Sequence, residues 1–376
     1  MTASLSSSQI RLLADFRAGR IPALARAVSI VENHRDGFSA MLTQMHPLVG
    51  RARRVGITGP PGAGKSTLTT RLALAYRAAG LRVGIVAVDP TSPFTGGALL
   101  GDRIRMEEVA LDPGVFIRSM ATRGSLGGLA TATREVCDVI DAFGMDVILL
   151  ETVGVGQSEL DVARAADTTL VVLVPESGDA IQTLKAGVME IADVFTVNKA
   201  DRPGADRLQN DIELMLGLRT GASTHVPAHH GVDLRTVTDR DALRDAMNPA
   251  RAARAAGLAA EPEQWTPPVL RTVAANGDGI PDVLDALQRH FGYLVRSGEL
   301  AARRRVRLRE RVMEVVEQQL RERLWTDAST LLWLDGQLSA LEAGEIAPFA
   351  VADALRARSG HLLTTVWRSP STGMTG

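Results

Sequence analysis

Apolar, β-branched runs alternate with segments of helical periodicity over residues 49–295. The runs that predict strands are Val55–Thr58, Arg82–Val88, Val115–Arg118, Asp146–Glu151, Thr168–Val174, Val194–Val197 and Val269–Val273. Strands of this kind, separated by helices, favour an α/β fold with a mostly parallel sheet and helices on both of its faces. Ligands of such sheets bind beyond the carboxyl ends of the strands, so we expect the chemistry in the loops that follow these runs.

Residues 1–48 have the periodicity of helices. Ile10, Leu13 and Phe16 share one helical face, and Pro22 stands where a second helix would begin. No pattern typical of a catalytic site stands out in this part of the chain. We therefore expect a helical extension that packs on the main domain.

Helices are also predicted after residue 296. An apolar stripe follows helical spacing at Leu308, Val312, Val315, Leu320 and Leu324. Arginines crowd the start of this stripe, but glutamates follow at once, which argues against a nucleic-acid patch. We expect residues 296–360 to associate with a second copy in a homodimer and residues 361–376 to form a polar tail.

The composition argues against several classes of partner and of site. The 42 basic residues nearly balance the 43 acidic ones, so the net charge favours neither nucleic acid nor a membrane surface as a partner. The single cysteine, Cys137, excludes a disulfide framework and a CxxC metal site, and it suits a reducing compartment. The chain begins with serines rather than an apolar signal, and no apolar run approaches the ~20 residues of a membrane span. We expect a cytoplasmic protein.

The stretch Gly59–Ser66 fits the phosphate-binding pattern GxxxxGK[ST] and lies between a predicted strand and a predicted helix, as that motif requires. Its small residues let backbone N–H groups and the helix N-terminus face phosphate oxygens. The alternative is a glycine-rich turn with an idle lysine. Lys65 would add a charge between the outer phosphates, and the Ser66 hydroxyl would hold Mg²⁺. The other predicted contacts to phosphate are Gly62, Ala63 and Gly64.

Acidic residues end two further predicted strands. Asp89 follows the second strand and Glu151 ends the fourth, where a carboxylate can reach Mg²⁺. Asp102 could join them when its Gly- and Pro-rich loop closes, with a turn or helix cap as the alternative role of Asp89 and Asp102. Glu151 is followed by x-x-Gly, which a sensor of the γ-phosphate requires. Gln157 is a candidate for positioning the attacking water, or else a solvated glutamine.

The sixth predicted strand runs into an NKxD sequence, Asn198-Lys199-Ala200-Asp201. The Asp201 carboxylate can accept hydrogen bonds from N1–H and the 2-amino group of guanine, and adenine lacks that pair of donors. The stem of Lys199 can lie along the base. A matching loop follows the last strand, where the Ala274 N–H could meet the guanine oxygen. These motifs together predict that the nucleotide is GTP.

Only three of the 42 basic residues are lysines, so lysine survives where an ammonium is specifically useful. Two of the three belong to the motifs above. The third, Lys185, lies in a polar loop with Gly178, Asp179 and Gln182. We expect this loop to be a further mobile segment that Lys185 locks in one nucleotide state through an ion pair.

Several motifs match one family in the same order along the chain. They are the phosphate loop, AVDPTSPFTGGALLGDRIRM at 87–106, TRGSLGG at 122–128, ETVGVGQSE at 151–159, the stretch at 176–201 and WTPPV at 265–269. On these motifs the chain resembles the MeaB/ArgK/MMAA family of methylmalonyl-CoA mutase-associated P-loop GTPases, over roughly residues 50 to 300.

The resemblance implies a dimeric, Mg²⁺-dependent GTPase that chaperones an adenosylcobalamin-dependent acyl-CoA mutase. Such a chaperone gates cofactor loading and helps to replace damaged cofactor without binding cobalamin tightly, and contact with an adenosyltransferase would fit that role. The resemblance adds Thr67 to the phosphate and Mg²⁺ contacts and makes 178–185 the third switch loop. It also places Asp89, Asp102 and Glu151 in the Mg²⁺ and switch shell.

Two departures from the family pattern stand out. Val273 replaces the serine that usually precedes Ala274, and residues 205–262 form a longer segment than is typical. Two other classes of protein compete with the mutase chaperone. A metallochaperone GTPase for nickel enzymes would need a metal site, for which the segment offers only His225, His229 and His230, and loop histidines are the default interpretation. A protein kinase of a transport system would need to bind an acceptor hydroxyl, for which no feature is evident.

Overall fold

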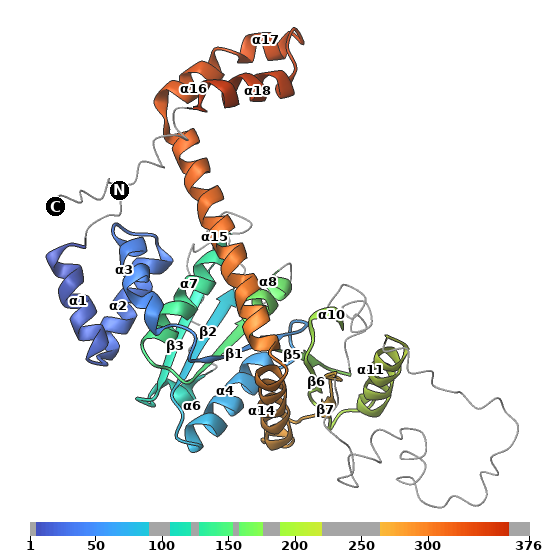
Figure 1. Cartoon of the computed structure of the whole chain (residues 1–376). Helices are drawn as coiled ribbons and strands as arrows, with labels where there is room; N and C mark the ends of the chain where they lie inside the picture. The colour runs from blue at the N-terminus through green and yellow to red at the C-terminus, as the bar shows by residue number, and fades with distance from the viewer. Residues whose placement is uncertain are drawn as a thin grey trace, which may run out of the picture. The chain divides into compact units, whose positions relative to one another are not determined.

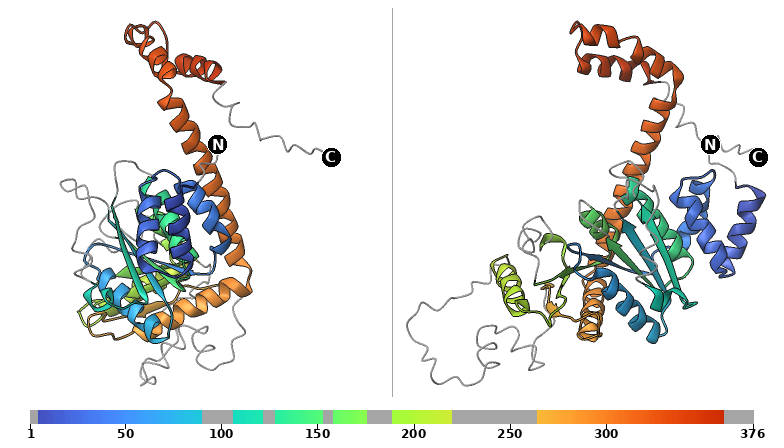
Figure 2. Two further views of the ribbon diagram at one scale, coloured as in Figure 1. Left: turned by 90° about the vertical axis from the view of Figure 1, so that its left-hand side faces the viewer. Right: turned by 180° about the vertical axis from the view of Figure 1, so that it is seen from behind.

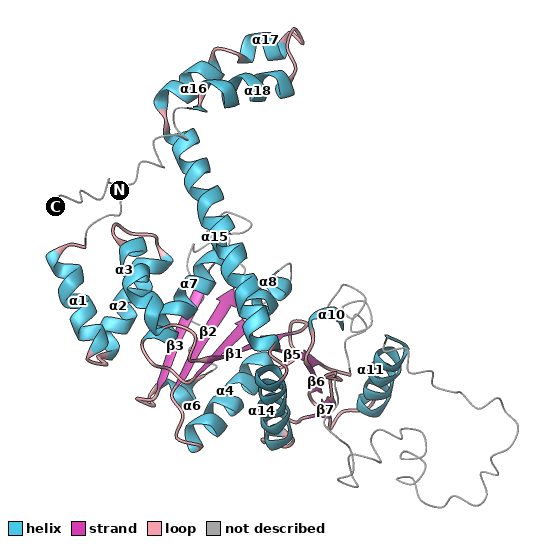
Figure 3. Cartoon of the chain, viewed as in Figure 1, coloured by secondary structure: helices cyan, strands magenta, loops and turns pink. Residues whose placement is uncertain are grey.

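The computed structural model describes residues 5–89, 106–121, 128–152, 158–175, 189–219 and 264–360. The chain divides into two compact units, residues 1–300 and 301–376. The first unit contains a parallel sheet and the second is helical (Figures 1 and 3).

The first unit is built on a seven-stranded sheet in which each neighbouring pair of strands is parallel. Its strands are β1 (Arg53–Thr58), β2 (Val83–Asp89), β3 (Val115–Ala121), β4 (Val147–Thr152), β5 (Thr168–Leu173), β6 (Val194–Val197) and β7 (Val269–Arg271). Their order across the sheet is β3-β2-β4-β1-β5-β6-β7. The predicted strands are all present, and the α/β fold with a parallel sheet is confirmed.

The strand order reverses at β1. Strands β2, β3 and β4 lie on one side of β1, and β5, β6 and β7 lie on the other. The register places Ile57 of β1 beside Glu151 of β4. The loop after β1 therefore lies at the switch point of the sheet, which is where ligands bind in open α/β sheets.

Side chains alternate between the two faces of the sheet. In β5, Leu170 and Val172 join the apolar cluster that contains α4 and α14, whereas Val171 and Leu173 join the cluster that contains α11. The helices of the first face are α4 (Lys65–Ala78), α6 (Glu107–Ala110) and α14 (Ile280–Arg296). Those of the other are α7 (Gly128–Ala142), α8 (Ser158–Ala165) and α11 (Ala205–Arg219). The short α10 (Met189–Ile191) precedes β6.

The N-terminal helices pack against α7 (Figures 1 and 2). They are α1 (Ser7–Arg17), α2 (Ile21–Glu32) and α3 (Phe38–Met45), followed by a 3₁₀ turn at His46–Leu48. The rings of Phe16 and Phe143 meet edge to face with centroids 5.1 Å apart. His34 lies 2.7 Å from the buried carboxylate of Glu135 on α7. The extension thus shares one apolar core with α7, β2 and β4.

A buried carboxylate joins the extension to the sheet. Asp141 of α7 accepts hydrogen bonds from the backbone N–H groups of Gly50, Arg51 and Ala52 at 2.8, 3.1 and 2.9 Å. The Arg54 guanidinium donates to Asp141 at 3.1 Å and to Asp138 at 2.7 Å. Burial alone would lower the pKa of Arg54, but the adjacent Asp138 and Asp141 carboxylates outweigh it and raise that pKa, so Arg54 stays charged.

The second unit consists of most of α15 (Glu299–Thr326), then α16 (Ala328–Asp335), α17 (Leu338–Glu342) and α18 (Pro348–Arg358). α15 is one long helix with no buried residue. Large apolar side chains are exposed along it at Val306, Leu308, Val312, Met313, Val316, Leu320 and Trp325. In contrast, Val351 and Leu355 of α18 are buried. No helix within the described ranges is long and apolar enough to cross a membrane.

Candidate functional site: a phosphate-binding loop joined to a base-reading loop

The phosphate-binding loop connects the end of β1 at Thr58 to the start of α4 at Lys65. Gly59, Gly62 and Gly64 have φ angles of 142°, 74° and 86°, which side-chain-bearing residues rarely adopt. The Lys65 ammonium is buried and donates to the carbonyl oxygens of Gly59 at 2.7 Å and Pro60 at 3.0 Å. These two hydrogen bonds place the positive charge of Lys65 inside the loop, where it would face bound phosphates.

Asn198 of the NKxD motif contacts this loop directly. Its side-chain Nδ2 donates to the carbonyl oxygen of Ala63 at 2.8 Å. A Cβ atom on Gly64 would collide with the same Nδ2. Gly64 is thus required for its positive φ and also because Asn198 packs against it.

The other end of the Asn198 side chain binds the loop that follows β7. Its Oδ1 accepts hydrogen bonds from the Thr272 hydroxyl at 3.1 Å and from the Ala274 N–H at 3.0 Å. The Thr272 hydroxyl lies 3.1 Å from that of Thr196 on β6. Asn198 therefore joins the phosphate-binding loop to the predicted base-reading loop, a role that the NKxD pattern alone does not reveal. A contact between the Ala274 N–H and guanine stays a prediction.

Residues 199–201 turn sharply beyond β6. Lys199 has a left-handed backbone with φ 56°, and the Ala200 N–H donates to the Thr272 carbonyl at 3.0 Å. Lys199 is half-buried, whereas Asp201 is exposed at the carboxyl end of the sheet. The contacts of Lys199 and Asp201 with a base stay predictions.

The structure also brings Ser66 and Glu151 together. Glu151 of β4 is only 1% exposed, and the Ser66 hydroxyl at the start of α4 donates to its Oε1. These are a hydroxyl and a carboxylate, the oxygen ligands that Mg²⁺ prefers. Asp89 ends β2, two strands from β1, and its contact with Mg²⁺ stays a prediction. Thr67, in the first turn of α4, is exposed.

Other predicted residues lie outside the described parts of the chain. These are Asp102, Gln157, Gly178, Asp179, Gln182, Lys185 and the three histidines at 225, 229 and 230. Among the residues that the structure does describe, no three His, Cys, Asp or Glu side chains gather in a way that could hold a metal ion by themselves.

Sequence reasoning missed Arg71 of α4. Its Nε donates to the Ala274 carbonyl at 3.2 Å and its Nη2 to the Ala275 carbonyl at 3.0 Å. The only signal in the sequence is its position six residues after Lys65 on the same helix. Its partners lie about two hundred positions away along the chain, so no local pattern connects them.

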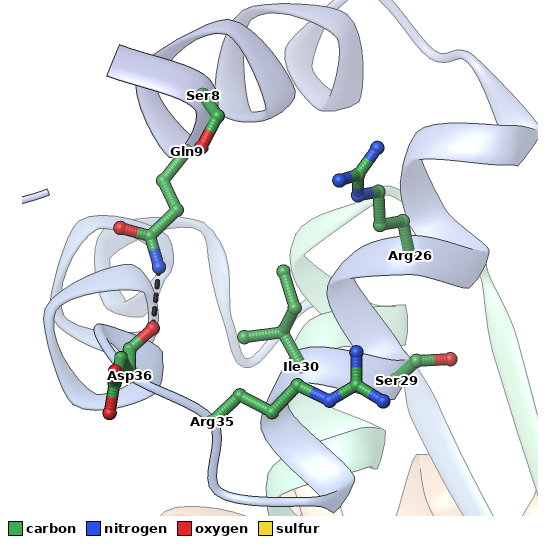
Figure 4. Close-up of a pocket in the computed structure, with 7 residues that line it drawn as sticks. All are labelled: Ser8, Gln9, Arg26, Ser29, Ile30, Arg35 and Asp36. Carbon is green, nitrogen blue, oxygen red and sulfur yellow. Dashed lines mark hydrogen bonds between the residues drawn. The ribbon is translucent and has the colours of Figure 1, made fainter. Parts of the chain in front are cut away.

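A separate hollow of about 500 Å³ lies among the N-terminal helices (Figure 4). It is lined by Ser8, Gln9, Arg26, Ser29, Ile30, Arg35 and Asp36. Gln9 closes one side by donating to the Asp36 carbonyl at 2.5 Å. None of the predicted nucleotide contacts lines this hollow.

Comparison with known proteins identifies the family. The model of the methylmalonyl-CoA mutase-associated GTPase MeaB matches residues 24–329, which include both loops described above. The chain belongs to the MeaB family. It is accordingly a P-loop GTPase that binds GTP, and the resemblance noted from the motifs is confirmed.

Individual relatives agree with this MeaB assignment. A Pyrococcus abyssi protein named as a GTPase is 46% identical over 305 residues, covering 81% of this chain and 83% of the relative. The Escherichia coli GTPase ArgK is 41% identical over 203 residues, covering 53% of this chain and 60% of ArgK. The mouse methylmalonic aciduria type A homolog, a mitochondrial protein, is 30% identical over 359 residues, covering 92% of this chain and 78% of the homolog.

A solved structure shares the fold of this MeaB-family chain. The crystal structure titled LAO/AO transport system kinase superposes with a TM-score of 0.60 at 24% sequence identity, covering 94% of this chain and 98% of that one. At this identity the similarity establishes the fold alone.

Proposed function

We propose that this GTPase is a chaperone of an adenosylcobalamin-dependent acyl-CoA mutase, either methylmalonyl-CoA mutase or a close relative. The observation that carries the proposal is the match of residues 24–329 to the mutase-associated GTPases. The similarity to the mouse methylmalonic aciduria homolog, over 92% of this chain, supports it. In this role the protein gates cofactor loading and protects or reactivates the mutase, and it holds no tightly bound cobalamin itself.

The phosphate end of the site rests on the loop after β1. The backbone of Gly62–Gly64 would wrap the phosphates, and Lys65, already held by two loop carbonyls, would bind their outer oxygens. Ser66 and Thr67 would contact phosphate and metal at the start of α4.

Ser66 and Glu151 fit Mg²⁺, because they bring hydroxyl and carboxylate oxygens into contact at the end of β4. Asp89 and Asp102 would complete the metal and switch shell. When bound, Mg²⁺ neutralises charge on the β- and γ-phosphates. The hydrogen bond from the Ser66 hydroxyl to the buried Glu151 carboxylate holds these two oxygens together.

The base end rests on the loops after β6 and β7. Asp201 would read N1–H and the 2-amino group of guanine, and the stem of Lys199 would cover the base. Ala274 would offer its N–H to the guanine oxygen. Since that N–H donates to Asn198 in this structure, the base would share or replace this hydrogen bond.

Hydrolysis in this account depends on positioning and charge stabilisation rather than on covalent chemistry. Gln157 would orient the attacking water, and the loop with Gly178, Asp179, Gln182 and Lys185 would respond to the nucleotide state. Basal hydrolysis is then slow, and the mutase accelerates it by ordering these switch loops.

The proposed partners are the mutase, a second copy of this chain and, during cofactor delivery, an adenosyltransferase in the cytoplasm. The exposed apolar residues of α15, such as Val312, Val316 and Leu320, support the homodimer. Apolar side chains spaced at helical intervals on one long helix are typical of a helix that packs against another.

Protection of a mutase during turnover tests the proposed function. During turnover, a mutase should lose activity more slowly in the presence of this protein and GTP than it does alone. A Lys65→Ala variant, which cannot bind GTP productively, should give no protection. Equal inactivation rates in all three mixtures, for every adenosylcobalamin mutase of the same organism, would contradict the chaperone role and leave the GTPase intact.

A further inference from the structure

We propose that Arg71 is a positioning residue for guanine recognition, because it fixes the backbone of the base-reading loop at Ala274 and Ala275. The inference rests on the proposed role of Ala274 as the donor to the guanine oxygen. It adds a residue that lies outside the phosphate-binding and NKxD motifs.

Two of the three hydrogen bonds of the Arg71 side chain go to this loop. Its guanidinium donates through Nε to the Ala274 carbonyl at 3.2 Å and through Nη2 to the Ala275 carbonyl at 3.0 Å. Its Nη1 donates to Glu108 of α6 at 3.0 Å. A guanidinium presents its donors in a rigid planar fork, so it can hold two successive carbonyls, which an ammonium on a flexible stem does less well.

Arg71 acts from a fixed support. It lies on α4, whose Leu68 and Leu72 are completely buried in the core beneath the sheet. The Arg71 side chain is 29% exposed; its bond to the Ala274 carbonyl is partly buried, whereas its bond to the Ala275 carbonyl is exposed to water. Glu108 is 58% exposed, and an ion pair with so exposed a carboxylate contributes little. The partly buried bond to the Ala274 carbonyl is therefore the strongest of the three contacts.

Both the N–H and the carbonyl group of Ala274 are hydrogen-bonded to side chains. Its N–H donates to Asn198 Oδ1 at 3.0 Å and its carbonyl accepts from Arg71 at 3.2 Å, while the residue itself is 2% exposed. These two bonds fix the peptide groups on either side of Ala274, and the base would share or replace the bond to Asn198. Without Arg71 the loop must order on binding, and the cost of that ordering appears in nucleotide affinity rather than in the chemical step.

Arg77 provides a matched control on the same helix. It also donates to a backbone carbonyl, that of Leu81 at 2.8 Å, and to a carboxylate, that of Asp112 at 3.0 Å. None of its hydrogen bonds goes to the base-reading loop. A change at Arg77 therefore removes comparable contacts of α4 without touching the hydrogen bonds of Ala274.

The experiment compares full-length wild type, Arg71→Ala, Arg71→Lys and Arg77→Ala. Equilibrium binding is measured for GTP, for 6-thioguanosine triphosphate, whose sulfur is a weaker acceptor than the guanine oxygen, and for inosine triphosphate, which lacks the 2-amino group. Hydrolysis of GTP gives kcat and KM, and melting temperatures of the free proteins report folding.

The expected result is a loss of GTP affinity of about tenfold in Arg71→Ala, as two modest hydrogen bonds would give. The preference for GTP over the thio analogue shrinks, the preference over inosine triphosphate is kept, and kcat changes less than twofold. The affinity of Arg71→Lys for GTP should lie between those of wild type and Arg71→Ala. Arg77→Ala lowers the melting temperature but keeps both preferences.

Three results would overturn the inference. Wild-type preference for GTP over the thio analogue in Arg71→Ala would show that Arg71 does not position the donor. An equal loss of affinity for all three nucleotides, matched by Arg77→Ala, would reduce Arg71 to a general support of α4. A wild type that binds GTP and the thio analogue equally would overturn the base-reading role of Ala274 as well, while leaving GTP hydrolysis and mutase protection unaffected.

Discussion

The amide of Asn198 donates to the carbonyl oxygen of Ala63 at 2.8 Å and so connects the end of β6 to the phosphate-binding loop. Its carbonyl oxygen accepts from Thr272 and Ala274. Asn198 is 2% exposed, so all three of these contacts are shielded from water. One buried side chain thus joins the phosphate-binding loop to the loop that follows β7.

Replacement of Asn198 by Ala should reduce both stability and affinity. The Ala274 N–H and the Ala63 carbonyl would lose their partner in a buried place, at a cost of about 1–3 kcal/mol. We expect a lower melting temperature of the nucleotide-free protein and GTP binding weakened by at least tenfold. Thermal unfolding and equilibrium binding measure these effects. An unchanged melting temperature with lost affinity would mean that Asn198 contacts only the ligand.

Replacement of Ser66 by Ala should raise the Mg²⁺ concentration needed for hydrolysis. The variant loses one proposed metal ligand and leaves the buried Glu151 carboxylate without the hydroxyl that donates to it. Titration of GTPase activity with Mg²⁺ should show a half-maximal concentration about tenfold higher and a lower kcat. Thr70→Ala is a suitable control, because its hydroxyl donates only to the Ser66 carbonyl one turn earlier. A normal Mg²⁺ titration for Ser66→Ala would exclude it as a ligand.

Replacement of Asp201 by Asn should change base selectivity. An amide cannot accept both guanine donors and can instead donate to the 2-oxo group of xanthine. We expect the preference for GTP over xanthosine triphosphate to fall by about a hundredfold or more, which competition binding would measure. The melting temperature should stay constant, because Asp201 is exposed. Retention of the wild-type preference would contradict the base-reading role.

Replacement of Asp141 by Asn should destabilise the protein far from the nucleotide. The NH₂ group of the asparagine would face backbone N–H groups that now donate to the Asp141 carboxylate, so donor would meet donor. Arg54 would also lose one of its two carboxylate partners. We expect a loss of about 3 kcal/mol in the free energy of unfolding, measured by denaturant titration. Asp138→Asn, at a 32% exposed carboxylate, should cost less than about 1 kcal/mol. Equal effects of the two changes would refute the special role of Asp141.

The fold followed from local pattern, whereas the connections within the site did not. Strands such as Val194–Val197 are short apolar runs between helices, so their existence and order along the chain were predictable. The bond from Asn198 to Ala63 spans 135 positions and that from Arg71 to Ala274 spans 203. No local periodicity encodes such contacts, because they depend on how the completed sheet brings its loops together.

The helical extensions were likewise predictable, whereas their contacts with the sheet domain were not. The sequence predicted helices before residue 49 and after 296, and both are present. It gave no sign that Asp141 would bind the backbone of Gly50–Ala52, about ninety positions away. The roles of Asp102, Gln157 and Lys185 stay predictions.

The most direct test is GTP hydrolysis by the pure protein, alone and with each adenosylcobalamin-dependent acyl-CoA mutase from the same organism. We expect slow basal turnover that one mutase raises by at least tenfold. We also expect no turnover by Lys65→Ala with or without that mutase. Basal hydrolysis that no mutase changes would contradict the chaperone role.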